Sequence, residues 1–356
     1  MSTPSPLSAA PGLPREVALI ERWAGGFPRS PLQCNQRHES DAELIRLPGS
    51  PSVLALTTDA ISEEIESGLY ADPYLIGWMT VMVNASDLAA VGAAPLGILL
   101  NQTLPADPRD HDLDALQRGI RDACTVCGLP VLGGDTNFGA RLHMSACAVG
   151  LIADGRLLTR RGARPGDRLF ASGPLGLGGA FALARLLRPN VAPPPFQPAS
   201  RLGEGQIVRR FATCCMDTSD GAIATLDELS RVSGVGFGLH AAEEILHPAA
   251  LGAARAAGLP PWFMLAGPHG EFELLFTIPE PAITAFRAEA GAARWEPKEI
   301  GVVSAQSEMR VLANGRWLRL DTRAVRDAYA EAGGDPRAYL ARLVTINATM
   351  TPADTP

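Results

Sequence analysis

Residues 84–95, with the sequence NASDLAAVGAAP, limit how this chain can fold more than any other stretch. Apolar residues before it recur about every 3.6 positions, which predicts a helix that starts near Pro73 and has one buried face. Gly92 followed by Pro95 is typical of a helix end. Small side chains in the stretch allow another backbone to approach closely, yet they surround one carboxylate, Asp87. Because burying a lone carboxylate is costly, Asp87 is interpreted either as a ligand of Mg²⁺ or as a solvated residue on the outer face of the helix.

The length and composition restrict the class of protein. A chain of 356 residues is expected to form two domains. Its hydrophobic content of 46% and its mean hydropathy of +0.08 are typical of a soluble globular protein, and no apolar run is long enough to span a membrane. The net charge of −7 argues against nucleic acid or an anionic membrane as the partner. Residues 1–14 lack the features of a secretory signal, so we expect a disordered tail there, a second tail at 346–356, and a cytoplasmic location.

The polar, turn-rich segment 160–167 divides the predicted elements into two series. We expect an N-terminal domain over residues 15–160 and a C-terminal domain over residues 161–345. Predicted strands and helices follow one another in mixed order, without a regular βαβ repeat. This order favours an α+β fold over a doubly wound parallel sheet.

Six aspartates share one setting, because each lies in a turn or at the end of an apolar element, among small or hydroxyl residues. They are Asp41, Asp59, Asp87, Asp135, Asp217 and Asp220. Mg²⁺ prefers oxygen ligands and bridges carboxylates to phosphate oxygens, whereas carboxylates that cluster without a cation raise one another's pKa. If these residues converge, we expect a site for divalent ions; taken singly, each is interpretable as a turn or cap residue.

Three other features have both a structural and a functional interpretation. The Gly-rich residues 173–179 follow a predicted strand and open a helix, so their amides could bind phosphate, although the spacing matches neither a Rossmann motif nor a P-loop. Cys124 and Cys127 have CxxC spacing inside a predicted helix, which favours two buried thiols over a zinc site. His143, on a strand face, is expected to be a hydrogen-bonded structural residue.

Five short motifs occur in the order and spacing of a known superfamily. They are TTD at 57–59, NASDLAAVGAAP at 84–95, GGDT at 133–136, LTRRGARPGD at 158–167 and DTSDG at 217–221. Over about residues 15–325 the chain resembles the superfamily of aminoimidazole ribonucleotide (AIR) synthetase, the hydrogenase maturation protein HypE, selenophosphate synthetase and thiamine-monophosphate kinase, and it matches the last of these best. The resemblance implies an N-terminal domain that pairs with a second copy to form a homodimer. It also implies a small-molecule phosphotransferase that uses ATP and Mg²⁺.

The resemblance implies roles for individual residues, in a reaction where the protein mainly positions groups and neutralises charge. The implied catalytic residues are Asp87, Asp135 and Asp217. The implied metal ligands are Asp41, Thr57, Thr58, Asp59, Asp87, Asp135, Asp217 and Asp220. The implied nucleotide contacts are Thr57, Thr58, Gly134, Asp135, Arg160 and Ser219.

Departures from the family pattern concentrate on the acceptor side. The family's GxGDDAA loop is RHESDAE at 37–43, and its GGEDYEL motif is PHGEFEL at 268–274. Positions that correspond to the acceptor side are Glu66, His269, Gly270 and Thr322. His269 is interpretable as an acid–base group or as a surface residue. Three functions remain open: phosphorylation of a small-molecule acceptor, activation of an amide or carboxyl oxygen as in AIR synthetase or HypE, and silent nucleotide binding.

Overall fold

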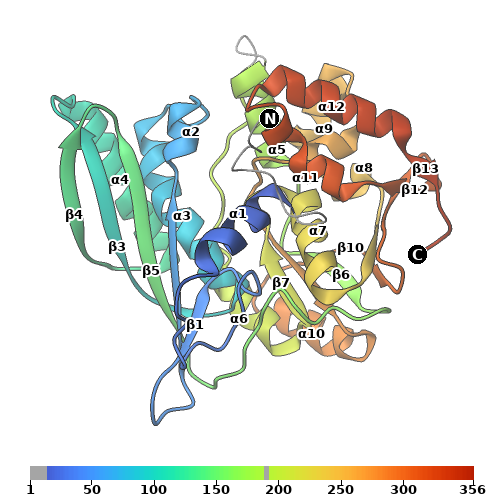
Figure 1. Ribbon diagram of the computed structural model, residues 1–356, viewed down its shortest axis with the longest axis horizontal. Coiled ribbons are helices and arrows are strands. Elements are labelled where there is room, and N and C mark those ends of the chain that lie inside the picture. The colour runs from blue at the N-terminus through green and yellow to red at the C-terminus, as the bar shows by residue number, and fades with distance from the viewer. Residues whose placement is uncertain (1–13, 188–191) are drawn as a thin grey trace, which may run out of the picture.

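The computed structural model describes residues 14–187 and 192–356, in which the strands form two separate sheets (Figure 1). The predicted N-terminal tail up to residue 13, and residues 188–191, lie outside the described residues. The class is α+β, as predicted, because helices and antiparallel strands alternate irregularly along the chain.

The first sheet has five strands among the described residues, in the order β1-β2-β5-β3-β4. These strands are β1 (Glu43–Arg46), β2 (Val53–Ala60), β3 (Ala94–Pro105), β4 (Val131–Gly139) and β5 (His143–Ile152). Neighbouring strands are antiparallel, except that β3 and β4 are parallel. In this order β4 lies at one edge of the sheet, and strands β5 and β3 lie between it and β2.

Helix α3 (Pro73–Ala90) connects the first sheet to the rest of the molecule. Most of its residues are buried, because it packs against the sheet, against α4 (Asp110–Cys127) and against α6 (Leu202–Phe211). A Cβ atom on Gly205 of α6 would lie 2.1 Å from the backbone oxygen of Ala89, so only glycine permits this contact. The small residues after position 84 thus admit a neighbouring backbone, as the sequence predicts. The ten-residue helix α1 (Arg15–Ala24) comes first in the chain, and the short helix α2 (Ser62–Glu66) packs against β5 of this sheet.

The second sheet has eight strands among the described residues, in the order β13-β12-β11-β8-β10-β6-β9-β7. They are β6 (Arg168–Ala171), β7 (Cys214–Asp217), β8 (Gly236–Leu239), β9 (Leu274–Ile278), β10 (Lys298–Ser304), β11 (Met309–Ala313), β12 (Arg316–Leu320) and β13 (Thr351–Pro352). Only the β8–β11 pair among them is parallel. Strand β7, at the edge, faces α3 of the first half.

Helices surround the second sheet and lie mostly above it in Figure 1. They are α5 (Leu177–Ala182) with the π-helix η1 (Leu183–Leu187), α7 (Ala222–Ser233), α8 (Ala242–Ile245), α9 (Pro248–Ala257), η2 (Pro261–Leu265), η3 (Glu280–Ala282), α10 (Ile283–Ala292), α11 (Thr322–Glu331) and α12 (Pro336–Thr349). One hydrophobic core runs from the first sheet through α3 to Phe170, Phe276 and Phe286, so the two halves share buried contacts.

Some predicted boundaries differ from the structure. The tail predicted at 346–356 is wrong in part: α12 continues to Thr349, held by buried Tyr339 and Leu343, and β13 pairs with β12. Helix α7 begins at Ala222, with Gly221 as its N-cap and no side-chain cap hydrogen bond. The predicted domain boundary near residue 160 falls between the last strand of the first sheet and the first strand of the second, and remains a prediction.

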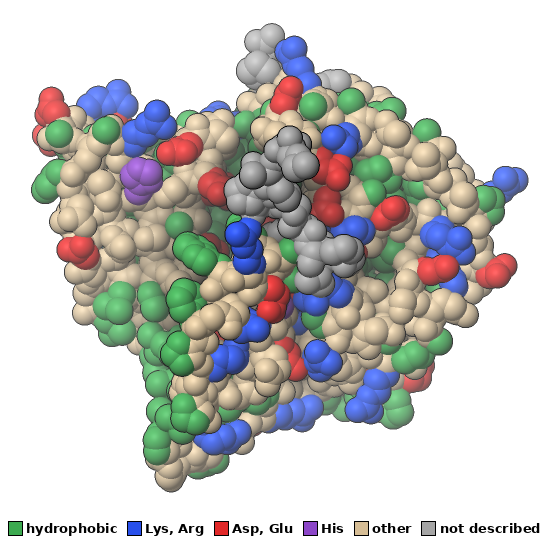
Figure 2. Space-filling model, in the orientation of Figure 1, with side chains coloured by type: hydrophobic (Ala, Val, Ile, Leu, Met, Phe, Trp, Pro, Cys, Tyr) green, Lys and Arg blue, Asp and Glu red, His purple; other side chains and the backbone are tan. Residues whose placement is uncertain are grey.

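Within residues 14–187 and 192–356, no helix combines the length and the apolar character that crossing a membrane requires. Positively and negatively charged side chains are interspersed on the face shown in Figure 2.

Candidate functional site

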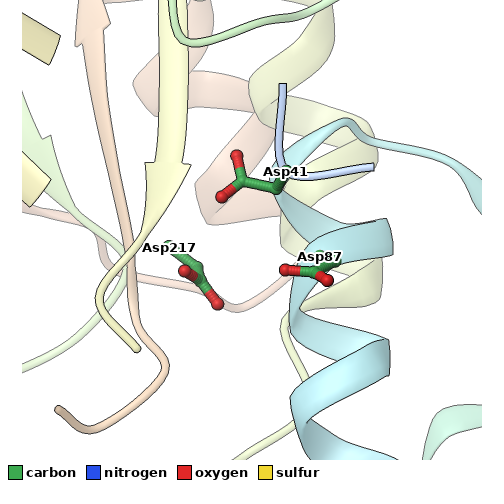
Figure 3. A group of neighbouring side chains, drawn as sticks. All are labelled: Asp41, Asp87 and Asp217. Atoms are coloured by element: carbon green, nitrogen blue, oxygen red, sulfur yellow. The ribbon is translucent and has the colours of Figure 1, made fainter. Parts of the chain in front are cut away.

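Asp41, Asp87 and Asp217 come together from three distant parts of the chain (Figure 3). Asp41 lies just before β1, Asp87 lies in the last turns of α3, and Asp217 ends β7. One carboxylate oxygen from each lies within 4.8 Å of the others. We call these three residues the acidic cluster. The contact between α3 and β7 therefore brings together carboxylates that the sequence separates by up to 176 positions, from 41 to 217.

Hydroxyl groups and one arginine surround the acidic cluster. Thr57 donates a hydrogen bond to Asp87, and Ser86 donates one to Oδ2 of Asp217. The hydroxyl of Ser219 donates to Oδ1 of Asp217 over 2.9 Å. These bonds hold two of the three carboxylates in fixed orientations.

Asp41 makes a different set of contacts. Its Oδ1 atom accepts a hydrogen bond from Arg160 over 3.0 Å. Its Oδ2 atom is buried and has no hydrogen-bond partner, and neither has Nε of Arg160. An unpartnered carboxylate oxygen in a buried site is costly unless a ligand completes it.

The charges of the cluster are not balanced by the protein alone. Burial raises the pKa of Asp41 to about 6 although Arg160 acts in the opposite direction. Burial, and then the neighbouring carboxylates of Asp217 and Asp41, raise the pKa of Asp87 well above its usual value. Burial also raises the pKa of Asp217. Three convergent carboxylates, one of which has an orphaned oxygen, and a threonine hydroxyl form a donor set that fits Mg²⁺.

The alternation of side chains along β2 divides the predicted residues 57–59 between two faces. Thr57 is buried and contacts Asp87, and Asp59 lies close enough to raise the pKa of Asp87. Thr58 points elsewhere, because its hydroxyl donates to the backbone oxygen of Ala146 on β5 over 3.0 Å. The structure thus brings Thr57 to the cluster and Asp59 near it, but places Thr58 outside.

Gly134 and Asp135 do not reach the acidic cluster within one chain. They lie on β4, where Asp135 is opposite Asn101 of β3 and its carboxylate accepts a hydrogen bond from Asn137. Two strands separate β4 from β2, and three strand spacings amount to about 14 Å. The strand order places Asp135 at the far edge of the sheet within its own chain, and its implied role at the metal and nucleotide site stays a prediction.

The predicted acceptor positions also do not converge. Glu66 is exposed, and its Oε1 atom lies 3.5 Å from Nη1 of Arg141. Thr322 lies at the start of α11, and its hydroxyl donates a hydrogen bond to Oδ1 of Asp227. A Cβ atom on Gly270 would lie 1.5 Å from the backbone oxygen of Thr218, so a glutamate could not occupy that position in this packing. His269 is buried rather than at the surface.

His269 and Asp220 instead line a separate cavity. The Nε2 atom of His269 and the hydroxyl of Tyr70 share a hydrogen bond of 2.6 Å. Burial lowers the pKa of His269 to about 4, which leaves its ring neutral at pH 7.

The Gly-rich turn and the CxxC pair have structural roles in this fold. The backbone amide of Gly176 donates to Oε2 of Glu271 over 2.7 Å in a buried contact, so the amide is already occupied by a carboxylate of the chain. Cys124 and Cys127 are free thiols, and Sγ of Cys127 contacts Met82.

Sequence reasoning missed three residues near these sites: Ser86, Glu64 and Tyr70. Ser86 was marked only by its position beside Asp87. Glu64 and Tyr70 have no local sequence signal. Glu64 matters because it lines the same cavity as His269, and Tyr70 matters because it shares a hydrogen bond with His269, 199 positions away in the sequence.

Comparisons with known proteins agree with the fold. Residues 39–152 match the family described as AIR synthase related protein, N-terminal domain. The thiamine-monophosphate kinase of Halobacterium salinarum is 31% identical over 279 residues, which cover 77% of this chain and 89% of the relative. This chain belongs to the thiamine-monophosphate kinase family. The Escherichia coli K12 member of the family is 29% identical over 274 residues, covering 74% and 83% of the two chains.

Solved structures lead to the same family. The structure described as AaThiL complexed with AMPPCP and TMP has a TM-score of 0.70 and 25% identity, and the match covers 88% of this chain and 97% of that one. The hydrogenase maturation protein HypE of E. coli shares the fold with a TM-score of 0.64 and 22% identity, over 76% and 85% of the two chains. The two-domain AIR synthetase-like fold that the motifs predict is therefore confirmed.

Proposed function

We propose that this protein is an ATP- and Mg²⁺-dependent phosphotransferase that acts on a small-molecule acceptor. The observation that carries the proposal is the acidic cluster, with its buried oxygen of Asp41 that has no partner. Membership in the kinase family supports ATP as the donor, because a structure of that family was described with the ATP analogue AMPPCP.

In this proposal, Asp41, Asp87 and Asp217 hold Mg²⁺, and Thr57 keeps the carboxylate of Asp87 oriented. The bound ion would neutralise negative charge on the phosphate groups. Arg160, which donates a hydrogen bond to Asp41, would contact the nucleotide in this proposal. Thr58, Asp59, Gly134, Asp135, Ser219 and Asp220 keep their implied roles only as predictions.

The reaction needs positioning and charge neutralisation more than a strong base. An oxygen of the acceptor forms a bond to the γ-phosphorus, the bond between that phosphorus and the β,γ-bridging oxygen breaks, and ADP leaves. If the accepting oxygen is a hydroxyl, its proton is released to water. The residues of the chain bind and orient the two reactants for this displacement.

Titration calorimetry with AMPPCP, with and without Mg²⁺, tests the proposal. We expect binding that depends on Mg²⁺ and that is lost in Asp87→Asn but kept in Asp122→Asn, which alters a carboxylate on α4 outside the cluster. ATP consumption with a panel of metabolites then separates an active enzyme from a silent nucleotide-binding protein. Absence of nucleotide binding in the wild-type protein under both conditions would contradict the proposal.

We also propose that the protein is a homodimer that pairs through β3 and β4. Edge strand β4 exposes Val131, Leu132 and Phe138, whose exposed fractions are 49%, 58% and 70%, and Leu99 of β3 is 42% exposed. Contiguous exposed apolar side chains along an unpaired edge are typical of an interface. This pairing would give Asp135 a place in a site shared by the two subunits. Phe138→Glu should convert the dimer to a monomer, as measured by sedimentation. A wild-type monomer would refute it.

A further inference from the structure

A cavity of about 560 Å³ lies between α2, the α5–η1 helix, the segment 259–269 and the C-terminal helices α11 and α12. Its volume is in the range of small-molecule sites. Most of its wall is aliphatic rather than aromatic. Aliphatic residues in the wall include Leu69, Leu183, Leu186, Leu259, Leu340 and Leu343.

The charged groups of the wall are mainly acidic. Glu63 and Glu64 of α2, and Asp220, line the cavity. Arg326 also lines it, but its guanidinium donates to Glu228 over 2.7 Å, so its charge is already matched. The Oε2 atom of Glu64 is buried and has no hydrogen-bond partner. A cationic ligand would satisfy that oxygen, whereas an anionic one would be repelled by Glu64 and its neighbour Glu63.

One further polar side chain lines this region and has a buried atom without a hydrogen bond. His269 is 5% exposed and lines the cavity, and its Nδ1 atom is buried without a hydrogen bond. Its other nitrogen contacts Tyr70, and its ring packs against Phe181 and Phe196. The ring is therefore held in one orientation and presents Nδ1 as a fixed polar contact.

The cavity lies close to the acidic cluster. Asp220 follows Asp217 by three positions in the turn after β7. Asp59 is near enough to both Asp87 and Glu64 to raise the pKa of each. A molecule held in the cavity could thus present one end toward the phosphates of a nucleotide bound at the cluster.

We propose that this cavity binds the acceptor, and that the acceptor is a small organic amine. Its ammonium group pairs with Glu64, its aliphatic or alicyclic body lies in the cavity, and its other end carries the oxygen that accepts the phosphoryl group. The inference rests on the proposed phosphotransferase function. The leucine side chains bury the hydrocarbon body, Glu64 with its neighbour Glu63 selects the positive charge, and Nδ1 of His269 contacts a further polar group of the acceptor.

Calorimetry with n-octylamine, n-octanol and thiamine monophosphate as probes tests the inference on the full chain. We expect n-octylamine to bind at least about tenfold more tightly than n-octanol, because a hydrogen bond to a charged group is worth that much. Glu64→Gln should remove this preference without weakening n-octanol. Asp122→Asn, which alters a carboxylate of α4 that does not line the cavity, is the control and should leave the preference intact.

Leu340→Trp, which fills part of the cavity, should weaken both eight-carbon probes by about tenfold or more. Equal binding of amine and alcohol to the wild-type protein, or amine binding that survives both Glu64→Gln and Leu340→Trp, would overturn the inference. Thiamine monophosphate binding more tightly than n-octylamine in a Leu340→Trp-sensitive manner would also overturn it, because the cavity would then hold a phosphorylated aromatic cation.

The two proposals fail separately. AMPPCP binding is measured without any acceptor, and Leu340→Trp should leave it unchanged. If the wild-type protein does not bind AMPPCP, the phosphotransferase function is refuted. If it binds AMPPCP but does not prefer n-octylamine to n-octanol, only the identity of the acceptor is refuted.

Discussion

Replacing Asp87 with asparagine is expected to stabilise the metal-free protein and to remove its stabilisation by Mg²⁺ and nucleotide. Asp87 is buried beside Asp41 and Asp217, with carboxylate oxygens within 4.8 Å of one another. Two full charges at that distance repel by about 3 kcal/mol at an effective dielectric constant of about 20. Because burial and the neighbouring carboxylates already raise the pKa of Asp87, part of this repulsion is relieved by proton uptake. We therefore expect the free energy of unfolding to rise by about 1 to 3 kcal/mol.

The shape of the site should survive this substitution. Thr57 donates its hydroxyl hydrogen to Asp87, and an asparagine side-chain oxygen can accept the same bond. Urea unfolding in EDTA measures the gain in stability, and repetition with Mg²⁺ and AMPPCP measures the gain that ligands supply. Asp122→Asn serves as the control and should match the wild type in both conditions. A variant Asp87→Asn that is less stable than the wild type in EDTA, or that gains as much from the ligands, would refute the reasoning.

Three other substitutions test the packing and the buried charges. Burial raises the pKa of Glu271 from 4.5 to about 8, so the folded state keeps a proton that the unfolded chain releases. The free energy of unfolding of the wild type should therefore fall as the pH rises between these values, by up to about 1.4 kcal/mol per pH unit. Glu271→Gln should flatten this slope in urea titrations at pH 5 to 8. Gly270→Ala should lower the melting temperature, because its Cβ would lie 1.5 Å from the backbone of Thr218; an unchanged melting temperature would contradict the packing. Gly205→Ala should destabilise the protein by separating α6 from Ala89, while Gly203→Ala on the same helix, where a Cβ meets no atom within 4 Å, should not.

Local pattern predicted the elements whose side chains show a clear period or a clear end signal. The helix that carries Asp87 was predicted from its apolar residues and from Gly92, but it is buried on nearly every side and not on the one face that was expected. Its small residues correctly indicated a close neighbour, which is Gly205. Helix α12 was missed, because its apolar residues do not form one distinct face and only Tyr339 and Leu343 are buried.

The candidate site was predictable only in part. Asp41, Asp87 and Asp217 were selected by their local setting and by the motif resemblance, but their convergence depends on α3 packing against β7. Asp135 has the same local setting and lies about 14 Å from β2, because strand order is decided by pairing between distant segments. Thr57 and Thr58 were both selected, but neighbouring residues of a strand point to opposite faces of the sheet, and only Thr57 reaches the cluster.

The backbone contact between α3 and α6 has a consequence for how reactants enter. Helix α3 carries Asp87 and touches Gly205 of the second half with no side chain between the two backbones. A hinge motion between the halves would have to break this contact and divide the shared core around Phe170. Access to the acidic cluster is therefore expected to depend on rearrangement of short bordering segments, such as residues 37–41, while the halves remain docked.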